Sequence, residues 1–383
     1  MTRPSDPLHV LLVDHAPIVG GVEMMIRDLL TELDPVRVAP TVVTDTASPM
    51  RGKFSLTVPE MALPLPRLNR NPLAALDWLI AALRLARFAR QSRTQIIQTF
   101  TTRTHLISAL AGRLSGVPVV WRMNDDTLPR SLAAIAGRVP RRIISVSNYL
   151  REHYRSSLTI TDLIPDGVPL PMVIPQAEAR RDLSFPPETL LIVLVARIVR
   201  WKGHRVFLHA LAPLAADHPR LHGLMVGGWS PSDNVPGPLG GGEPYQKELE
   251  SLVQSLGLTQ RVTFMGHTSA AARVFAAADI VAHTSILSEP FGRVIVEAMA
   301  AARPVVAAQA GGALEIVEPD VTGLLTPPGD VGALTEALRK LMDDSALRQR
   351  MGEAGRARAE REYSLKLMAE RFMQVWEEVA SPT

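Results

Sequence analysis

Two carboxylates eight positions apart, Glu289 and Glu297, are the side chains whose spacing first suggests chemistry. Glu289 is expected in a short loop, because a residue that precedes a proline, here Pro290, is disfavoured in the α region. Gly292 lets the backbone approach a ligand where the next helix begins, and a helix N-terminus binds anions. The carboxylates would flank a phosphate site and accept hydrogen bonds from hydroxyls at both ends of one ligand. A nucleotide-sugar has that distribution of groups.

The same spacing has a simpler interpretation, in which the two glutamates bind no ligand. Acidic residues near the start of a helix commonly cap it and complement its dipole on a solvated face. Because short motifs of this kind also arise by chance, other stretches of the chain bear on the choice.

Those stretches follow apolar runs that are typical of buried parallel strands, and ligands of open α/β sheets bind beyond the carboxyl ends of the strands. The candidates in these positions are Gly20 and Gly21 after 8–13, Arg197 and Lys202 after 190–196, Gly228 after 224–226, Glu289 after 280–284, and Gly311 with Gly312 after 304–307. With two such sheets facing each other, we expect these residues to line one cleft. A surface turn would explain any single glycine equally well.

Strand-like and helix-like stretches alternate along the chain, which predicts parallel sheets with helices on both faces. We expect an α/β protein with two Rossmann-like, doubly wound domains, at 1–172 and 173–362. The predicted strands are 8–13, 36–44, 96–100, 117–121 and 142–146, then 190–196, 224–226, 262–265, 280–283 and 304–307. Four prolines between 165 and 175 indicate a linker. Helices are predicted at 331–342, 346–362 and 364–379.

The composition is that of a globular protein. Its 383 residues, 46% hydrophobic and 21% charged, are enough for two domains with separate cores. The sequence has no cysteine, which excludes disulfides and cysteine-ligated metal sites and permits a reducing cytoplasm. The apolar run at 8–13 is too short for a signal peptide, and no run of eighteen apolar residues is present to cross a membrane. We therefore expect a cytoplasmic protein.

The net charge of +3 conceals an uneven distribution of charged residues. Residues 1–170 hold 20 Lys and Arg against 14 Asp and Glu, whereas residues 171–383 hold 21 against 24. A basic half is typical of proteins that contact nucleic acid or anionic membranes. The basic residues are not interleaved with aromatic ones and form no known recognition motif, so we expect no nucleic-acid partner.

The stretch from Arg67 to Arg93 contains a candidate membrane-surface helix. Its apolar stripe, with Trp78 nearby, consists of Leu73, Leu76, Leu79, Ile80, Leu83 and Phe88. Arginines recur at every third position beyond it, at Arg84, Arg87, Arg90 and Arg93. A basic amphipathic helix can lie on an anionic membrane, where lipid-linked acceptors reside, and would bring the protein to the inner face of that membrane. The alternative is a sheet-covering helix with its arginines in solvent.

Five stretches resemble, in order, the motifs of family 4 of the retaining glycosyltransferases, which have the GT-B fold. The segment from Glu289 to Glu297 resembles the E-x7-E signature of that family. The other four stretches are Gly20-Gly21-Val22-Glu23, Arg197 to Gly203, Gly311 to Val317, and Thr322-Gly323-Leu324-Leu325 with the following Pro328-Gly329-Asp330. Together they span most of the chain, within 8–342. In proteins of this type the last helix, here within 363–383, crosses back onto the first domain.

The resemblance implies catalytic roles for Arg197, Lys202 and Glu289. The two cations would hold the diphosphate and stabilise the charge on the departing nucleotide without a metal ion. Glu289 would bind hydroxyls of the transferred sugar, and Glu297 would bind those of the ribose. The simpler alternative for Arg197 and Lys202 is a pair of solvated charges at the end of a strand.

The remaining donor-site residues also follow from the resemblance. Backbone N–H groups for the sugar and phosphates would come from Phe291, Gly292 and Arg293. Gly20 and Gly21 would let the first domain approach the phosphate. Gly228 and His267 are further donor-side candidates, with His267 beside the nucleobase. No metal ligand is assigned, and no cofactor is expected besides the nucleoside-diphosphate sugar, which is a co-substrate.

One departure concerns the acceptor side. Many members of the family have a histidine at the end of a first-domain strand where this chain has Asn124 and Asp125, and the nearest upstream histidine, His105, belongs to an earlier element. Either residue could position the acceptor, or the loop could be structural.

The sequence therefore predicts a retaining glycosyltransferase that moves a sugar from a nucleoside-diphosphate sugar to a carbohydrate or lipid-linked acceptor, in polysaccharide biosynthesis. A degenerate donor-binding subunit would account for the missing histidine. A nucleotide-sugar epimerase would share the architecture but would lack the E-x7-E signature.

Overall fold

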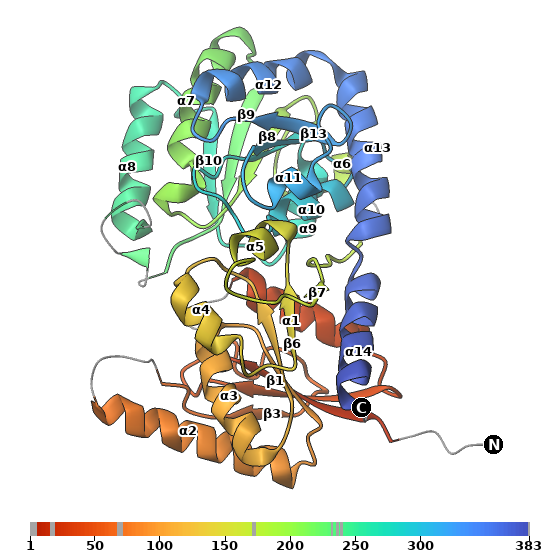
Figure 1. The fold of residues 1–383 in the computed structure, drawn as a ribbon. Helices are drawn as coiled ribbons and strands as arrows, with labels where there is room; N and C mark the ends of the chain where they lie inside the picture. Colours follow the sequence, from red (N-terminus) through yellow and green to blue (C-terminus); the bar gives the residue numbers. More distant parts are fainter. Residues whose placement is uncertain are drawn as a thin grey trace, which may run out of the picture. The chain divides into compact units, whose positions relative to one another are not determined.

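The computed structural model describes residues 6–15, 20–66, 72–170, 174–230, 233–234, 237 and 240–381, without the side chains of 72–74. The chain divides into two compact units. The N-terminal unit comprises residues 1–167 and 365–383, and the C-terminal unit comprises residues 168–364. Each unit contains one parallel sheet between layers of helices (Figure 1). The predicted α/β class with two Rossmann-like sheets is confirmed.

The sheet of the N-terminal unit has seven strands in the order β3-β2-β1-β4-β5-β6-β7. The strands are β1 Leu8–Asp14, β2 Val38–Thr44, β3 Glu60–Ala62, β4 Ile96–Thr99, β5 Val119–Met123, β6 Arg142–Ser145 and β7 Asp162–Leu163. The helices of this unit are α1 Gly21–Glu32, α2 Pro72–Gln91, α3 Thr102–Ser115, α4 Arg130–Ala136, α5 Asn148–His153 and α14 Leu365–Ala380. The chain order reverses between β1 and β4, which makes that pair the switch point of the sheet.

Strand β1 explains how this sheet acquires two buried faces. Successive side chains of a strand point to opposite sides, and both sets are apolar here. Val10 and Leu12 pack in one cluster with residues of α1 and α14, whereas Leu11 and Val13 pack in another with residues of α2 and α3. A continuous apolar run is therefore the expected sequence of a central parallel strand.

The sheet of the C-terminal unit has six strands in the order β10-β9-β8-β11-β12-β13, with its switch point between β8 and β11. The strands are β8 Leu190–Val195, β9 Leu221–Val226, β10 Val262–Gly266, β11 Ile280–His283, β12 Val305–Ala308 and β13 Gly323–Thr326. The helices are α6 Gln176–Asp182, α7 His204–Asp217, α8 Gly242–Ser255, α9 Ala271–Ala277, α10 Arg293–Ala300, α11 Ala313–Ile316, α12 Val331–Asp343 and α13 Ser345–Glu362, with a 3₁₀ turn at Arg200–Lys202.

Helix α14 is far in sequence from the rest of the N-terminal unit and packs into its core. The Nε1–H of the buried Trp376 donates to Oε1 of Gln98 on β4 at 2.9 Å. At the rim of the same contact, Arg37 donates to carboxylate oxygens of Glu370 and Glu377, at 2.7 Å in each case. These bonds tie α14 to β4 and to the residue that precedes β2.

Three strands of the structure are absent from the sequence prediction, and all three are edge strands. β3 and β7 are the two edges of the first sheet, and β13 is one edge of the second. They have three, two and four residues respectively. β3 and β7 are partly exposed, and all three strands are short, so none has the long apolar run by which a central strand is recognised.

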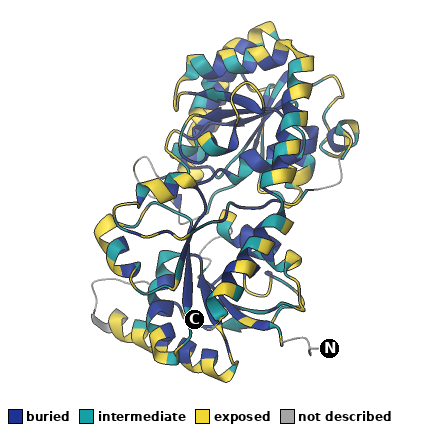
Figure 2. Cartoon of the chain, turned by 45° about the vertical axis from the view of Figure 1, so that its right-hand side comes forward, coloured by how far each residue is buried: buried dark blue, intermediate teal, exposed yellow. Residues whose placement is uncertain are grey.

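Helix α2 covers the sheet with a different face from the one predicted. The residues buried in the core are Ala81, Ala82, Leu85, Ala86 and Ala89. The leucine-rich stripe instead faces solvent, with exposed fractions of 55% for Leu76, 41% for Leu79, 36% for Ile80 and 49% for Leu83 (Figure 2). Helix α2 therefore covers the sheet and leaves Arg84, Arg87 and Arg90 in solvent, as the alternative expected, but it does so with its alanine-rich face and not with the leucine stripe. Small side chains let α2 approach the neighbouring core closely, which the apolar periodicity of the sequence could not reveal.

Candidate functional site

The two parts of the chain that flank the switch point of the C-terminal unit meet at an ion pair. Lys202 follows β8, Glu289 follows β11, and their Nζ and Oε1 atoms lie 2.5 Å apart. Both side chains are largely buried, with exposed fractions of 15% and 12%. The switch point is where ligands of open α/β sheets bind, so this buried pair is the centre of the candidate site.

Backbone contacts fix the two loops against each other. Ile286 N–H donates to the carbonyl oxygen of Trp201 at 2.7 Å, and the Thr284 hydroxyl donates to the carbonyl of Lys202 at 2.9 Å. Gly203, with a φ of 73°, lies so close that a Cβ there would be 1.8 Å from the Thr284 carbonyl oxygen. Only glycine fits this position, and it brings Lys202 to Glu289.

Glu289 receives three hydrogen bonds, all on Oε1. The donors are Lys202 Nζ, His283 Nε2 at 2.8 Å, and the Ser285 hydroxyl. Burial acts to raise the pKa of Glu289, but its contacts with Lys202 and His283 outweigh the burial and hold the pKa well below its usual value. The carboxylate is therefore ionised at neutral pH.

Gly311 and Gly312 pack closely against the backbone of the Glu289 loop. Gly312 N–H donates to the carbonyl of Glu289 at 2.8 Å. A Cβ at Gly311 would lie 2.1 Å from the carbonyl oxygen of Glu289, and one at Gly312 would lie 2.2 Å from that of Phe291. These glycines permit the close backbone approach that holds the loop in place.

The loop ends where α10 begins, at Gly292, which has a φ of 108°. The ring of Phe291 is buried and meets the ring of Tyr363 edge to face, with centroids 5.9 Å apart. Within the described part of the chain, the backbone N–H groups of Phe291 and Gly292 donate to no acceptor. Unsatisfied N–H groups at a helix start are suited to bind an anion.

The second carboxylate, Glu297, lies one helical turn beyond the start of α10. Its Oε1 accepts from Nε of Arg293 at 2.9 Å, in a pair four residues apart on the helix surface. The structure thus brings Arg293 and Glu297 together, on an element separate from the Glu289 loop.

Three other predicted donor residues lie at the carboxyl ends of neighbouring strands. Arg197 follows β8 and its Nη1 is 2.9 Å from Oδ1 of the buried Asp233, in the loop after β9. Gly228 follows β9 and His267 follows β10, and a Cβ at Gly228 would lie 3.7 Å from that of His267. These three residues therefore lie at the same edge of the sheet as the loops that hold Lys202 and Glu289.

In the N-terminal unit, Gly20 and Gly21 lie between β1 and α1. Glu23 accepts a hydrogen bond from the N–H of Gly20 at 2.9 Å. A Cβ at Gly21 would meet no atom within 4 Å. Across the switch point of this sheet, His15 Nδ1 and the Thr101 hydroxyl are 3.0 Å apart.

Both polar atoms of the Asn124 side-chain amide form hydrogen bonds. Its Nδ2 donates to the carbonyl of Phe100 at 2.7 Å, and its Oδ1 accepts from the fully buried Arg122 at 2.9 Å. Asp125 accepts from both the N–H and the hydroxyl of Thr127, which closes a turn. The acceptor role of Asn124 and Asp125 stays a prediction, and these contacts also suit a structural loop.

His105 does not take the place of the missing acceptor-side histidine. Its ring is fully buried and stacks on Trp121, with centroids 4.1 Å apart, and its Nε2 lies 3.1 Å from the carbonyl oxygen of Ala136. Burial lowers the pKa of His105 to about 4, which keeps the ring neutral within the core.

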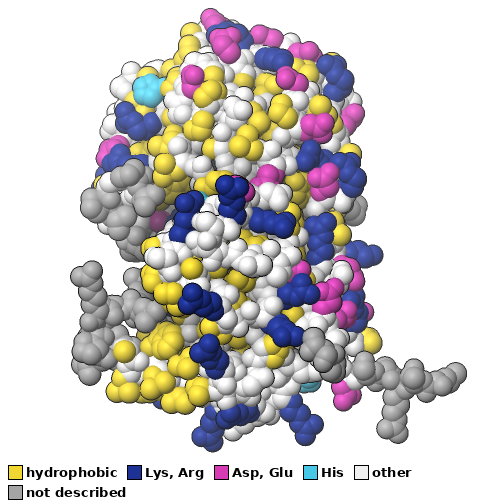
Figure 3. All heavy atoms as spheres, in the orientation of Figure 1, with side chains coloured by type: hydrophobic (Ala, Val, Ile, Leu, Met, Phe, Trp, Pro, Cys, Tyr) yellow, Lys and Arg dark blue, Asp and Glu magenta, His cyan; other side chains and the backbone are white. Residues whose placement is uncertain are grey.

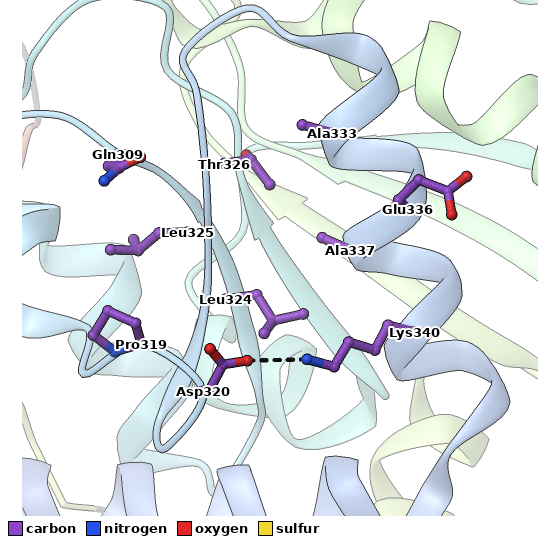
Figure 4. Close-up of a pocket in the computed structure, with 10 residues that line it drawn as sticks. All are labelled: Gln309, Pro319, Asp320, Leu324, Leu325, Thr326, Ala333, Glu336, Ala337 and Lys340. Atoms are coloured by element: carbon purple, nitrogen blue, oxygen red, sulfur yellow. Dashed lines mark hydrogen bonds and ion pairs between the residues drawn. The ribbon is translucent and has the colours of Figure 1, made fainter.

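A surface pocket of the C-terminal unit lies away from these residues, beside the edge strand β13 and helix α12 (Figure 4). Asp320 and Lys340 form an ion pair across it at 2.9 Å. Its walls contain none of the predicted site residues.

The sequence prediction missed three polar partners of the site: His283, Ser285 and Asp233. His283 is the last residue of β11, inside a run predicted as a buried strand, and Asp233 lies in the stretch between 228 and 242, which is rich in glycine, proline and serine. A histidine at the end of an apolar strand was the available signal for His283, because buried polar side chains usually have a bonded partner.

Family models match both parts of the chain. The model described as glycosyl transferases group 1 covers residues 175–358, and that of glycosyltransferase family 4 covers residues 19–170. The chain belongs to glycosyltransferase family 4. The predicted resemblance is confirmed, and the enzyme class is that of a glycosyltransferase.

Two relatives show how this family 4 member compares with named proteins. The GDP-mannose-dependent monoacylated alpha-(1-6)-phosphatidylinositol monomannoside mannosyltransferase of Corynebacterium glutamicum is 26% identical, over 96% of each chain. The D-inositol 3-phosphate glycosyltransferase of Corynebacterium kroppenstedtii is 33% identical over 59% of this chain. The match spans 50% of the latter protein, about half its length.

Solved structures confirm the GT-B fold of this family 4 chain. Anabaena Alr3699/HepE in complex with UDP-glucose is 25% identical, with a TM-score of 0.81 over 97% of this chain and 100% of that one. Sucrose-phosphate synthase from Thermosynechococcus elongatus is 23% identical, with a TM-score of 0.80 over 97% and 99%.

Proposed function

We propose that this enzyme transfers a sugar, with retention of anomeric configuration, from a nucleoside-diphosphate sugar to a carbohydrate or lipid-linked acceptor. The observation that carries the proposal is the buried Lys202–Glu289 pair at the switch point of the C-terminal unit. It sets a cation for the diphosphate beside an anion for sugar hydroxyls, which are the two kinds of group that a nucleotide-sugar presents.

The diphosphate would lie at the start of α10. The N–H groups of Phe291 and Gly292 would donate to its oxygens, and the charges of Lys202 and Arg197 would neutralise them. Two fixed cations stabilise the charge that develops on the departing nucleotide, so the reaction requires no metal ion. Departure and attack would occur on the same face of the sugar, without a covalent intermediate.

The rest of the donor would extend to either side of the diphosphate. Oε1 of Glu289 is occupied by three donors in the described structure, and Oε2 would accept from a sugar hydroxyl. Glu297 would release Arg293 and accept hydrogen bonds from the ribose hydroxyls. His267 and Gly228 would lie near the nucleobase.

The names of similar proteins suggest two donors to test first. One relative is named for its dependence on GDP-mannose, and one structural neighbour holds UDP-glucose. We therefore expect UDP or GDP to raise the melting temperature of the protein in the presence of EDTA, because a ligand that binds only the folded state stabilises it. Stabilisation that disappears in EDTA would contradict metal independence.

Measuring nucleotide release from a sugar donor distinguishes a glycosyltransferase from a donor-binding subunit. Release of UDP or GDP from the matching sugar donor identifies a transferase, whereas a donor-binding subunit would bind the nucleotide and release none. Failure of UDP, GDP and both sugar donors to bind would contradict the proposed function.

The exposed face of α2 is the surface through which we expect the enzyme to contact an anionic membrane that holds a lipid-linked acceptor. The apolar residues Leu76, Leu79, Ile80 and Leu83 occupy its first part, and the exposed Arg84, Arg87 and Arg90 continue the same face toward its end. Figure 3 shows hydrophobic side chains gathered over α2 at lower left, with basic ones further along the helix. Of the described helices, none is long and apolar enough to cross a bilayer.

This arrangement suits apolar insertion followed by charge attraction to anionic headgroups. Replacing Leu76, Leu79 and Leu83 together by serine should abolish cosedimentation with anionic phospholipid vesicles and leave the melting temperature nearly unchanged, because these side chains are exposed. Reversing the charges of Arg84 and Arg87 should weaken binding in a salt-dependent way.

The matched control replaces Leu314 and Val321 by serine, since these are exposed apolar residues of the C-terminal unit. That variant should bind vesicles as the unmodified protein does. Unchanged sedimentation of the triple serine variant would remove α2 as the membrane surface.

A further inference from the structure

His283 lies at the centre of the candidate site, and no role has been assigned to it so far. It is the last residue of β11, and its side chain is 7% exposed. Its Nε2 is 2.8 Å from Oε1 of Glu289, and the Ser285 hydroxyl lies 3.4 Å from the same nitrogen. A ring anchored at the end of a central strand is held more rigidly than a side chain in a loop.

The hydrogen bonds of the imidazole indicate which nitrogen carries the proton. Nδ1 is buried and has no partner within the described part of the chain, whereas Nε2 faces a carboxylate oxygen. A ring protonated on Nε2 alone donates to Glu289 and leaves only a lone pair at Nδ1. The geometry therefore assigns the proton that faces Glu289 to Nε2.

Lys202 forms an ion pair with Glu289, but this pair would be weakened when a donor binds. In the proposed donor complex, the same ammonium group has to meet the diphosphate, which competes with Glu289 for its charge and its three N–H donors. If Lys202 alone oriented the carboxylate, donor binding would release Glu289 at the moment when its contact with the sugar is needed. His283 donates to the same oxygen from a different strand and does not depend on Lys202.

We propose that His283 is a positioning residue that holds the Glu289 carboxylate in its orientation while Lys202 engages the diphosphate. This inference rests on the proposed function. The bond to Oε1 leaves Oε2 for a hydroxyl of the transferred sugar, and we expect it to persist through the reaction because His283 is buried at the end of β11.

Two substitutions of His283 separate the loss of its hydrogen bond to Glu289 from a change in side-chain volume. His283→Gln places an N–H donor near the position of Nε2, whereas His283→Met fills similar space without a donor. His283→Met should lower kcat about ten-fold, the value of a hydrogen bond to a charged group, while the Kd for UDP or GDP changes less than about two-fold. His283→Gln should recover most of the lost kcat.

The matched control is His222→Met. His222 belongs to the same unit, and its Nε2 lies 2.9 Å from the hydroxyl of Thr263, at a distance from the Glu289 loop along the sheet. This variant should keep kcat. Equal losses in the Gln and Met variants of His283, or a loss in His283→Met no larger than that of the control, would overturn the proposal.

Nitrogen-15 NMR of histidine-labelled protein gives a readout independent of activity. The His283 signals, assigned by their absence from His283→Gln, should have the pattern of the Nε2–H tautomer both without ligand and with saturating UDP or GDP. They should shift in Glu289→Gln. A proton on Nδ1, or a change of tautomer on nucleotide binding, would overturn the proposal. Absence of any nucleotide binding overturns the proposed function and this inference with it, whereas normal turnover by His283→Met overturns this inference alone.

Discussion

Replacement of Glu289 by glutamine should lower kcat by about ten- to a hundred-fold, the equivalent of about 1.5–3 kcal/mol for one charge-assisted hydrogen bond. Glutamine keeps the size of the side chain but removes the charge that pairs with Lys202 and that strengthens the bond to a sugar hydroxyl as the anomeric bond breaks. Contacts that strengthen in the transition state affect kcat, so the donor KM should change little. Initial-rate kinetics over a range of donor concentrations measure both constants.

Glu297→Gln should have the opposite signature, with a raised donor KM and a nearly constant kcat. The ribose does not change during transfer, so a contact with it contributes equally to the ground state and the transition state. Glu248→Gln is a suitable control, because Glu248 also pairs with a cation of the 200–202 turn, Arg200, at 2.6 Å, but on the exposed face of α8. Transfer within about two-fold of normal in both Glu289→Gln and Glu297→Gln would show that the donor site is elsewhere.

Lys202→Met should weaken the binding of UDP or GDP by about ten- to a hundred-fold while leaving the affinity for the corresponding nucleoside nearly unchanged. The nucleoside lacks the diphosphate that the ammonium group contacts. Isothermal calorimetry with both ligands separates this effect from a general loss of structure, because a distorted site would lose both affinities together.

The same substitution should also lower the melting temperature, because it leaves Glu289 as a buried anion held only by His283 and Ser285. Removing one partner of a buried ion pair costs up to about 3–5 kcal/mol, and these two remaining donors should reduce that cost. Lys340→Met removes a lysine that pairs with Asp320 at 2.9 Å in the surface pocket of Figure 4. A larger loss of nucleotide affinity in Lys340→Met than in Lys202→Met would assign the nucleotide to that pocket.

The central strands of both sheets could be predicted because each of them is a continuous apolar run, which is visible in its own sequence. The runs at 190–196 and 280–283 are apolar on both faces, and this pattern is required of any strand buried between two helical layers. The motif residues that follow these strands, including Lys202 and Glu289, were placed correctly at the ends of their strands for the same reason. A short edge strand such as Asp162–Leu163 has no comparable pattern, since its pairing is decided by its neighbour.

The contacts within the site depended on the tertiary structure. Sequence spacing identified Lys202 and Glu289 as separate ligand groups, but β8 and β11 are adjacent only because the strand order reverses there. That adjacency converts two candidates into one buried ion pair. The bonds of His283 and Ser285 to Glu289 are local in sequence, and they depend on how the loop after β11 folds back on the end of its own strand.

Helix α2 shows most clearly which properties follow from the sequence and which depend on the tertiary structure. The sequence by itself determined that the stretch is helical, apolar and rich in arginine, because these properties belong to its residues. Which face is buried depended on the space left by the sheet and by α3, and this space favours Ala82, Ala86 and Ala89 over the larger leucines. Close packing selects side chains by volume as well as by polarity, and volume complementarity exists only between elements that have already come together.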